Sequence, residues 1–217
     1  MKYKTLLLLA CLMFTLGACF NDNGINGQGP ITIETRTVEP FTAIRSTLPA
    51  NIFISQEAEQ SVRIETHENV LAVIDSYVID GELILDLNRS LRNIDRLNVY
   101  ISAEDYRRVE LSGAANLSSE GCLNLDDLDI RLSGAGNINI CGTAENLGVN
   151  ISGAGNFQGF GMAAQSVNAS VSGAGNMRVT AEQVLDVTIS GSGSIFYKGN
   201  PQINSNISGA GRLIDAN

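Results

Sequence analysis

Hydrophobic and polar residues alternate in many short runs along this chain. In the second half, Leu128, Ile130 and Leu132 form one such run, and Leu185, Val187 and Ile189 form another. A period of two residues is typical of β-strands that bury one face. The pattern therefore predicts an all-β fold built from short strands.

A short glycine-rich element follows these runs and occurs six times. Its serines lie between 18 and 21 residues apart, at Ser112, Ser133, Ser152, Ser172, Ser190 and Ser208. A near-constant period of this length is typical of a stack of repeats. We therefore predict a single-stranded parallel β-helix, or β-solenoid, with about 18–21 residues per rung.

The repeated element, most often Ser-Gly-Ala-Gly-Asn, is predicted to form the corner of each rung. Its glycines are free to adopt positive φ, so the chain can turn sharply there. Stacked rungs place equivalent residues ~4.8 Å apart, so the asparagine amides of one column can hydrogen-bond along the axis. The predicted structural corner residues are Ser133, Gly134, Gly136, Asn137, Ser152, Gly153, Gly155, Asn156, Ser172, Gly173, Gly175 and Asn176.

The first half reads as a less regular version of the same unit. Ile44–Ile52 aligns with Val109–Leu117 and shares its apolar ends, its alanine and its asparagine. Asp80 and Gly81 separate two strand-like runs and predict a hairpin turn. We expect residues 31–107 to form irregular rungs that cap the stack, because an open sheet edge must be closed, and residues 108–217 to form the regular rungs.

The N-terminus predicts export and lipid attachment. Two lysines precede an apolar run too short to span a bilayer, so residues 1–18 read as a signal peptide. Leu16–Cys19 resembles the lipobox of bacterial lipoproteins, which makes Cys19 the predicted lipidation site and the membrane a predicted contact. The alternative is an ordinary secretory signal. Residues 19–30 are polar and glycine-rich and predict a flexible tether. The expected location is the bacterial cell envelope, with the outer membrane preferred.

Charge and composition exclude several functions. The formal net charge is -9 and there is no basic stripe, which argues against binding to nucleic acid. His67 is the only histidine and has no partner at metal-ligand spacing, so a solvated edge position is expected. Asp126, Asp127 and Asp129 lie among alternating apolar residues and predict a solvent-facing strand surface rather than a Ca²⁺ site. No metal and no cofactor are predicted.

Parallel β-helices also carry polysaccharide-active enzymes, so catalysis is the main competing hypothesis. Such sites need converging carboxylates, or a carboxylate with a basic residue, projecting from adjacent rungs. The outward positions hold no stacked acid pair: Asp129, Arg131, Asn150, Asn168, Ser170, Asp186 and Thr188. The sequence therefore favours a non-enzymatic binding module for glycan or an envelope protein. The alternative is a passive structural protein or one that associates with its own copies.

Four aromatic residues of the repeats bear on that choice. Phe157, Phe160, Phe196 and Tyr197 would favour binding if they project outward and a structural role if they are buried.

Two cysteines occupy equivalent positions in consecutive rungs. Cys122 and Cys141 each lie 11 residues before a corner serine, Ser133 and Ser152. We expect their Cα atoms to be closer than ~7 Å, which is the limit for a disulfide. The spacing leaves two states open, a disulfide or a reduced and buried pair.

The chain resembles the autotransporter-adhesin head GIN domain family of Bacteroidetes envelope lipoproteins. The resemblance runs from Ile31 to about Ile214 and rests on Val38–Ile44, Val62–Glu65, Asp80–Leu85 and the Ser-Gly-Ala-Gly-Asn series. It implies a single-chain β-helix, usually with a lipoprotein signal. The family has no established catalytic residues, so the resemblance implies none for this chain.

Overall fold

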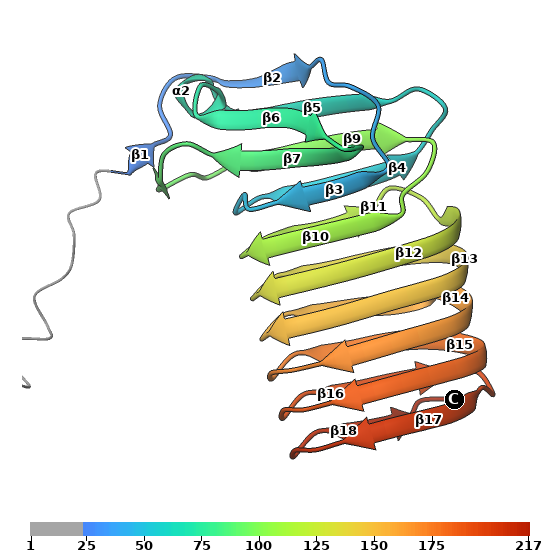
Figure 1. Cartoon of the computed structure of the whole chain (residues 1–217). Helices are drawn as coiled ribbons and strands as arrows, with labels where there is room; N and C mark the ends of the chain where they lie inside the picture. The colour runs from blue at the N-terminus through green and yellow to red at the C-terminus, as the bar shows by residue number, and fades with distance from the viewer. Residues whose placement is uncertain (1–23) are drawn as a thin grey trace, which may run out of the picture.

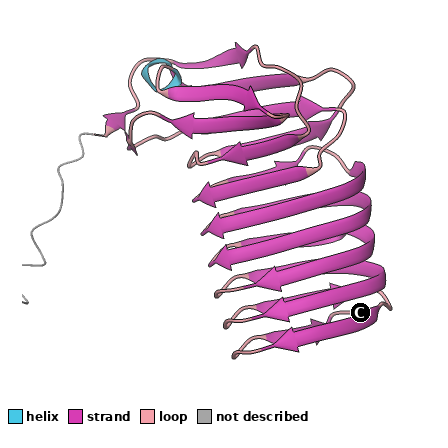
Figure 2. Ribbon diagram, in the orientation of Figure 1, coloured by secondary structure: helices cyan, strands magenta, loops and turns pink. Residues whose placement is uncertain are grey.

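The computed structural model describes residues 24–217, and Figure 1 shows them as one solenoid of strands below an irregular cap. Figure 2 shows that strands make up most of the described chain, with loops at the corners and a single turn of helix in the cap. Sixteen strands form one continuous sheet, and β1 pairs with β8 in a separate two-stranded sheet. The predicted all-β solenoid is confirmed. No helix within residues 24–217 is long and apolar enough to cross a membrane.

The cap and the first rungs contain short strands and a single turn of helix. They are β1 (Ile25–Asn26), β2 (Ile31–Arg36), β3 (Ala43–Ser46), β4 (Asn51–Gln56), β5 (Ser61–His67), α2 (Glu68–Leu71), β6 (Ile74–Ile79), β7 (Glu82–Leu87), β8 (Leu91–Arg92) and β9 (Leu97–Ala103). The repeats form β10 (Arg108–Gly113), β11 (Asn116–Ser119), β12 (Leu123–Gly134), β13 (Asn137–Gly153), β14 (Asn156–Val171), β15 (Asn176–Ile189), β16 (Ser194–Lys198), β17 (Gln202–Ile207) and β18 (Arg212–Asp215).

The solenoid has two long outer faces. Face A is the outer surface of β6, β7, β3 and β10, then of the second parts of β12 to β15, and finally of β17. Face B is the outer surface of β2, β5, β9, β4 and β11, then of the first parts of β13 to β15, and finally of β16 and β18. The long strands therefore bend around the molecule and serve both faces.

The alternating residues fill the space between the faces. Leu128, Ile130 and Leu132 are buried, and so are Leu185, Val187 and Ile189. Their polar neighbours point outward, as the period of two predicts. Aliphatic columns of this kind give the stack a continuous hydrophobic core.

The corner glycines are needed mainly because successive rungs touch there. Ser112 pairs with Ser133 and Ser133 pairs with Ser152, so the corners stack in register. A Cβ at Gly173 or Gly175 would overlap the carbonyl oxygen of Gly153 or Gly155 in the rung above. Positive φ, the reason expected from the sequence, holds at Gly134 and Gly153 only among the predicted corner glycines. Close backbone approach is the more general cause.

The cap reverses the order of two rungs. The rung of β3 and β4 pairs with β10 and β11 on one side and with β7 and β9 on the other. Ile44 faces Val109 and Ile52 faces Leu117, so the predicted alignment of the diverged repeat is confirmed. The later rung nevertheless lies above the earlier one, which the sequence pattern did not indicate.

Antiparallel strands close the end of the stack. β5 pairs antiparallel with β9, β2 covers β5, and β6 folds back on β7. The β6–β7 turn places Asp80 at φ 51° and Gly81 at φ 76°, which confirms the predicted hairpin. Tyr77 and Ile79 of β6 point outward and are 44% and 54% exposed.

The chain is ordered against the cap before Ile31. β1 pairs with β8, and the Asn69 side chain accepts the Gln28 N–H and donates to the Asn26 carbonyl, both at 2.8 Å. We call residues 24–30 the N-terminal arm. This part of the predicted flexible tether therefore lies on the cap, whereas residues 1–23, including the predicted signal peptide and Cys19, lie outside the described residues.

Candidate binding surfaces

A ladder of side-chain amides runs along face B. Each amide nitrogen donates to the amide oxygen one rung nearer the cap, at 3.0 to 3.4 Å. The ladder consists of Asn98, Asn51, Asn116, Asn137, Asn156 and Asn176. At the other end, Asn176 accepts the Ser194 N–H at 3.1 Å. The amide contacts expected along the corner column are confirmed, and Asn98 extends them beyond the glycine elements.

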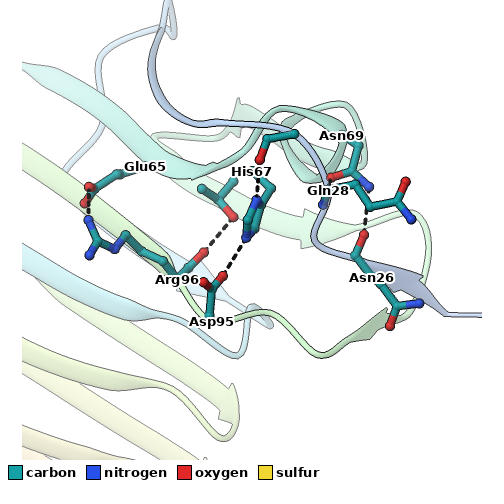
Figure 3. A network of polar contacts seen from close by, with 9 residues as sticks. Asn26, Gln28, Glu65, His67, Asn69, Asp95 and Arg96 are labelled. Atoms are coloured by element: carbon teal, nitrogen blue, oxygen red, sulfur yellow. Dashed lines mark hydrogen bonds and ion pairs between the residues drawn. The ribbon is translucent and has the colours of Figure 1, made fainter.

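Glu65 ends the ladder at the cap. It accepts the Asn98 amide at 2.9 Å and the Arg96 guanidinium at 2.9 Å, and Figure 3 shows the contact with Arg96. These two hydrogen bonds lower the pKa of the Glu65 carboxyl. A carboxylate only accepts hydrogen bonds, and every ladder amide donates toward the cap, so Glu65 supplies the required acceptor. The ladder is therefore a closed structural column.

An aromatic stack lies beside the ladder at its cap end. Strand register aligns Arg63 of β5 with Tyr100 of β9, and Tyr100 with Phe53 of β4. The Tyr100 and Phe53 rings are stacked with centroids 5.2 Å apart, and the Arg63 guanidinium lies 5.4 Å from the Tyr100 centroid. Ser118 is opposite Phe53 in the next rung. The aromatic stack therefore ends at Phe53, because the next rung has a small polar serine at this position instead of a ring.

A polar hollow of about 310 Å³ adjoins this stack, and we call it the cap hollow. Its wall includes Ser55, Glu57, Glu59, Arg63, Tyr100 and Glu120. Ser55 donates to Glu57 at 2.9 Å, whereas the Glu59 and Glu120 carboxylates make no hydrogen bond within residues 24–217. Burial, followed by the hydrogen bond to Glu65, raises the pKa of Tyr100. The hollow thus offers free acceptors, a guanidinium and an aromatic edge.

Face A has a shallower depression of about 510 Å³. At its cap side, Asp129 contacts Arg131 at 2.9 Å and Arg108 at 3.5 Å. Toward the tail, the lining changes to the neutral side chains of Asn150, Asn168 and Ser170. Glu110, the other acid in the lining, pairs in register with Arg131 rather than with an acid. In this depression each acid therefore stands opposite an arginine of an adjacent rung, and neither stands opposite another acid.

The four candidate aromatics divide between core and surface. Phe157 is fully buried, and Tyr197 is half-buried against the core. Phe160 and Phe196 are half-buried on face B, where Lys198 and Arg178 lie over their rings at 4.8 and 5.1 Å. Of the four candidates, only Phe160 and Phe196 therefore project outward, which is the position that favours binding.

The two cysteines are neighbours in adjacent rungs. Cys122 and Cys141 form a disulfide with Cα atoms 4.6 Å apart. Cys122 is exposed and Cys141 is partly exposed, so they are not the buried reduced pair that was the alternative.

His67 is a structural contact rather than a solvated residue. Its side chain is 14% exposed, and its ring nitrogens lie 2.9 Å from the Gly29 carbonyl oxygen and 2.5 Å from Asp95 (Figure 3). The expectation of a solvated edge position was wrong because the N-terminal arm packs over the ring. Sequence reasoning missed this contact because arm and ring are 38 residues apart.

The acidic run on β12 follows the predicted alternation. Asp126 and Asp127 are exposed and Asp129 is partly exposed, while Leu128 and Ile130 are buried. Asp127 accepts a hydrogen bond from Asn146 at 2.8 Å. Within residues 24–217, no group of three or more His, Cys, Asp or Glu side chains is placed to hold a metal ion.

Known structures share this fold. An adhesin structure from Bacteroides fragilis, described as "putative", is 24% identical, covers 88% of this chain and 100% of its own, and has a TM-score of 0.74. An adhesin from Parabacteroides merdae with the same qualifier is 20% identical, covers 89% and 99%, and has a TM-score of 0.54. A "Putative lipid binding protein" from Parabacteroides distasonis is 19% identical, covers 90% and 100%, and has a TM-score of 0.55.

Sequence comparison gives the family. A search of curated proteins finds no significant match. The model of one family, by contrast, matches residues 40–201. The chain therefore belongs to the family described as "Putative auto-transporter adhesin, head GIN domain".

Proposed function

We propose that this chain is a non-enzymatic, lipid-anchored binding protein of the bacterial cell envelope that holds a glycan in the cap hollow. The adhesin description of the family supports a binding role. The observation that carries the glycan assignment is the cap hollow itself, where free carboxylates and a guanidinium surround an aromatic edge. Sugar hydroxyls both donate and accept, so they match such a mixed set of polar groups.

The polar groups of the cap hollow are suited to vicinal hydroxyls. The Glu120 and Glu59 carboxylates would accept from the ligand, and the Arg63 guanidinium would donate to it. Hydrogen bonds to charged groups are the stronger ones, so a few of them can orient a small polar ligand. Arg63 is already ordered by its position over Tyr100, which lowers the entropic cost of binding.

A glycan array tests the binding role. The protein is the chain from residue 19 with Cys19→Ser, which removes the predicted lipid. We expect binding to a subset of glycans, and loss of about tenfold or more in affinity for Glu120→Gln because a charge-assisted hydrogen bond is removed. Asn150→Ala, an exposed amide on face A, is the matched control and should bind as the parent does. Uniform absence of binding across host, plant and bacterial glycans would refute the proposal.

Lipid attachment at Cys19 has its own test. The support is the Leu16–Cys19 sequence behind a short apolar run. In cells fed radioactive fatty acid, the natural chain should be labelled and fractionate with membranes, because two acyl chains give stable anchoring. Cys19→Ser should lose both properties. A Cys19→Ser chain that still fractionates with membranes would show that the lipid is not attached at this residue.

A further inference from the structure

The tail half of face B gathers all the basic residues that follow Arg131 in the chain. Arg178, Lys198 and Arg212 are the only lysines and arginines between residues 132 and 217. They lie on β15, β16 and β18, at outward positions of the same face. We call these three residues, with Phe160 and Phe196, the tail patch.

The positive charges of the tail patch are not neutralised by neighbours. None of the three forms an ion pair with any side chain in residues 24–217, whereas Arg45, Arg96, Arg108 and Arg131 all do. The acids of the same stretch have other partners or lie elsewhere. Asp186 binds Asn204 on face A, and Asp215 binds Asn217.

Aromatic rings and an amide hold two of the cations in place. The Arg178 guanidinium lies 5.1 Å from the Phe196 centroid and donates to the Gln158 oxygen at 3.1 Å. The Lys198 ammonium lies 4.8 Å from the Phe160 centroid. Both distances are within the range of a cation–π interaction. Long basic side chains normally lose much rotamer freedom on binding, and these two have already lost part of it.

The three cations lie on successive rungs but in different columns of the face, because Arg178 aligns with Phe196, Lys198 with Thr180 and Arg212 with Ser194. Arg178, Lys198 and Arg212 belong to three successive rungs, which are spaced ~4.8 Å apart along the axis. The outer two therefore lie ~10 Å apart along the axis, with Lys198 between them in height. Such a staggered set matches anionic groups spaced along an extended chain that crosses the rungs.

We propose that the tail patch binds acidic glycans through their carboxylate or sulfate groups. The aromatic rings flank the cations and would contact the apolar faces of the sugar rings. A duplex nucleic acid or an anionic membrane presents a much larger negative surface. Such a surface would be repelled by a protein of formal net charge -9 that offers it only the three cations of the tail patch. The site is separate from the cap hollow and does not depend on it.

The test measures binding of two acidic oligosaccharides, oligogalacturonate for carboxylate and heparin hexasaccharide for sulfate, by titration calorimetry. Neutral maltohexaose is the reference ligand. We expect the chain with Cys19→Ser to bind at least one acidic ligand, more weakly at high salt because screening weakens exposed charges. Arg178→Gln with Lys198→Gln should lower that affinity by about tenfold or more, since two charged contacts are lost.

Two controls distinguish this site from the cap hollow and from general loss of charge. Arg108→Gln with Arg131→Gln removes two arginines from face A and should leave acidic-glycan affinity within about twofold. Glu120→Gln impairs only the cap hollow and should also leave it unchanged, so the two proposals can fail separately. Circular dichroism checks that every variant is folded. Equal binding of maltohexaose, unchanged affinity in the Arg178/Lys198 variant, or tighter binding to duplex DNA or phosphatidylglycerol vesicles would overturn the proposal.

Discussion

The cap and the repeats build the same kind of rung by different means. In the repeats, each rung copies the one above it, so one contact recurs at every level, as in the amide ladder and the glycine corners. In the cap, each contact occurs once: Glu65 ends the ladder, and the buried Tyr106 hydroxyl lies 2.7 Å from the Ser55 carbonyl oxygen. In the repeats, the same hydrogen bond therefore recurs at every rung, and the close approach of successive backbones limits the size of the corner residues. The cap instead depends on contacts that each occur once.

The close approach of successive rungs at the corner glycines predicts the largest loss of stability. Gly175→Ala should lower the free energy of unfolding by about 3 kcal/mol or more, because the new Cβ would overlap the Gly155 carbonyl oxygen and neither backbone can move without separating the rungs. Gly148→Ala is the matched control, since its Cβ would come closest to the Asp129 side chain, at 3.2 Å, and would reach backbone atoms only at the ordinary contact distance of 3.8 Å. Urea denaturation measures both. Similar stability of the two variants would disprove close backbone approach as the reason for the corner glycines.

The disulfide joins two successive rungs and should have the next largest effect. Cys122→Ala with Cys141→Ala should reduce the free energy of unfolding by about 3 kcal/mol, because a bond between residues 19 apart limits the unfolded chain. Denaturation with and without a reducing agent measures this. The reducing agent should destabilise the natural chain to the level of the double variant and leave that variant unaffected. A natural chain insensitive to reduction would contradict the assignment.

The contribution of the amide ladder to stability can be measured by comparing an asparagine in the ladder with a nearby asparagine outside it. Asn137→Ala removes the donor to Asn116 and the acceptor for Asn156, and should cost about 1 kcal/mol. Asn139 lies two residues further along the same strand and its side chain makes no hydrogen bond within residues 24–217, so Asn139→Ala should cost less than about 0.5 kcal/mol. Thermal unfolding of both variants checks the difference. Equal losses would mean that the ladder does not stabilise the fold.

The same difference between the regions explains what could be predicted from the sequence. Repetition makes the second half readable, because the period gives the rungs, the alternation gives the core, and the spacing of Cys122 and Cys141 gives their adjacency. In the cap, the strands and the Asp80 turn could be predicted from the sequence. The inverted rung order could not, because strand pairing between distant segments leaves no local pattern.

The candidate sites were less accessible to prediction. Tyr100 of β9, Arg63 of β5 and Glu120, in the turn after β11, come together only through the cap register, so no spacing in the sequence marks the cap hollow. The basic residues of the tail patch can be found in the sequence, but their position on one face requires knowing which side each strand residue points to.

The last and smallest effect concerns how the N-terminal arm is held on the cap. The Gly29 carbonyl and the Asp95 carboxylate can only accept hydrogen bonds, so His67 satisfies both only when both its ring nitrogens carry protons. The Gly29 contact first, and Asp95 second, raise the pKa of His67, while His67 lowers the pKa of Asp95. The stabilisation of the arm by protonated His67 is therefore complete below about pH 6.5, the ordinary pKa of histidine. It is lost as pH rises through the raised pKa of His67. The stabilisation of the arm by ionised Asp95 is present above the ordinary pKa of aspartate. It is lost only as pH falls through the lowered pKa of Asp95.

We therefore expect the arm to be held most firmly in mild acid. The observable is hydrogen exchange at the Gln28 amide, which donates to Asn69, after correction for the intrinsic effect of pH. Its protection should fall as pH rises above the raised His67 pKa, while the Asn156 amide, bonded to the Gly136 carbonyl in the repeats, should keep its protection. His67→Gln cannot donate from two ring nitrogens, so it should weaken protection in acid and remove its dependence on pH. If Gln28 in the natural chain keeps the same protection across that range, the arm is held without a charged His67, and the cap does not depend on this single contact.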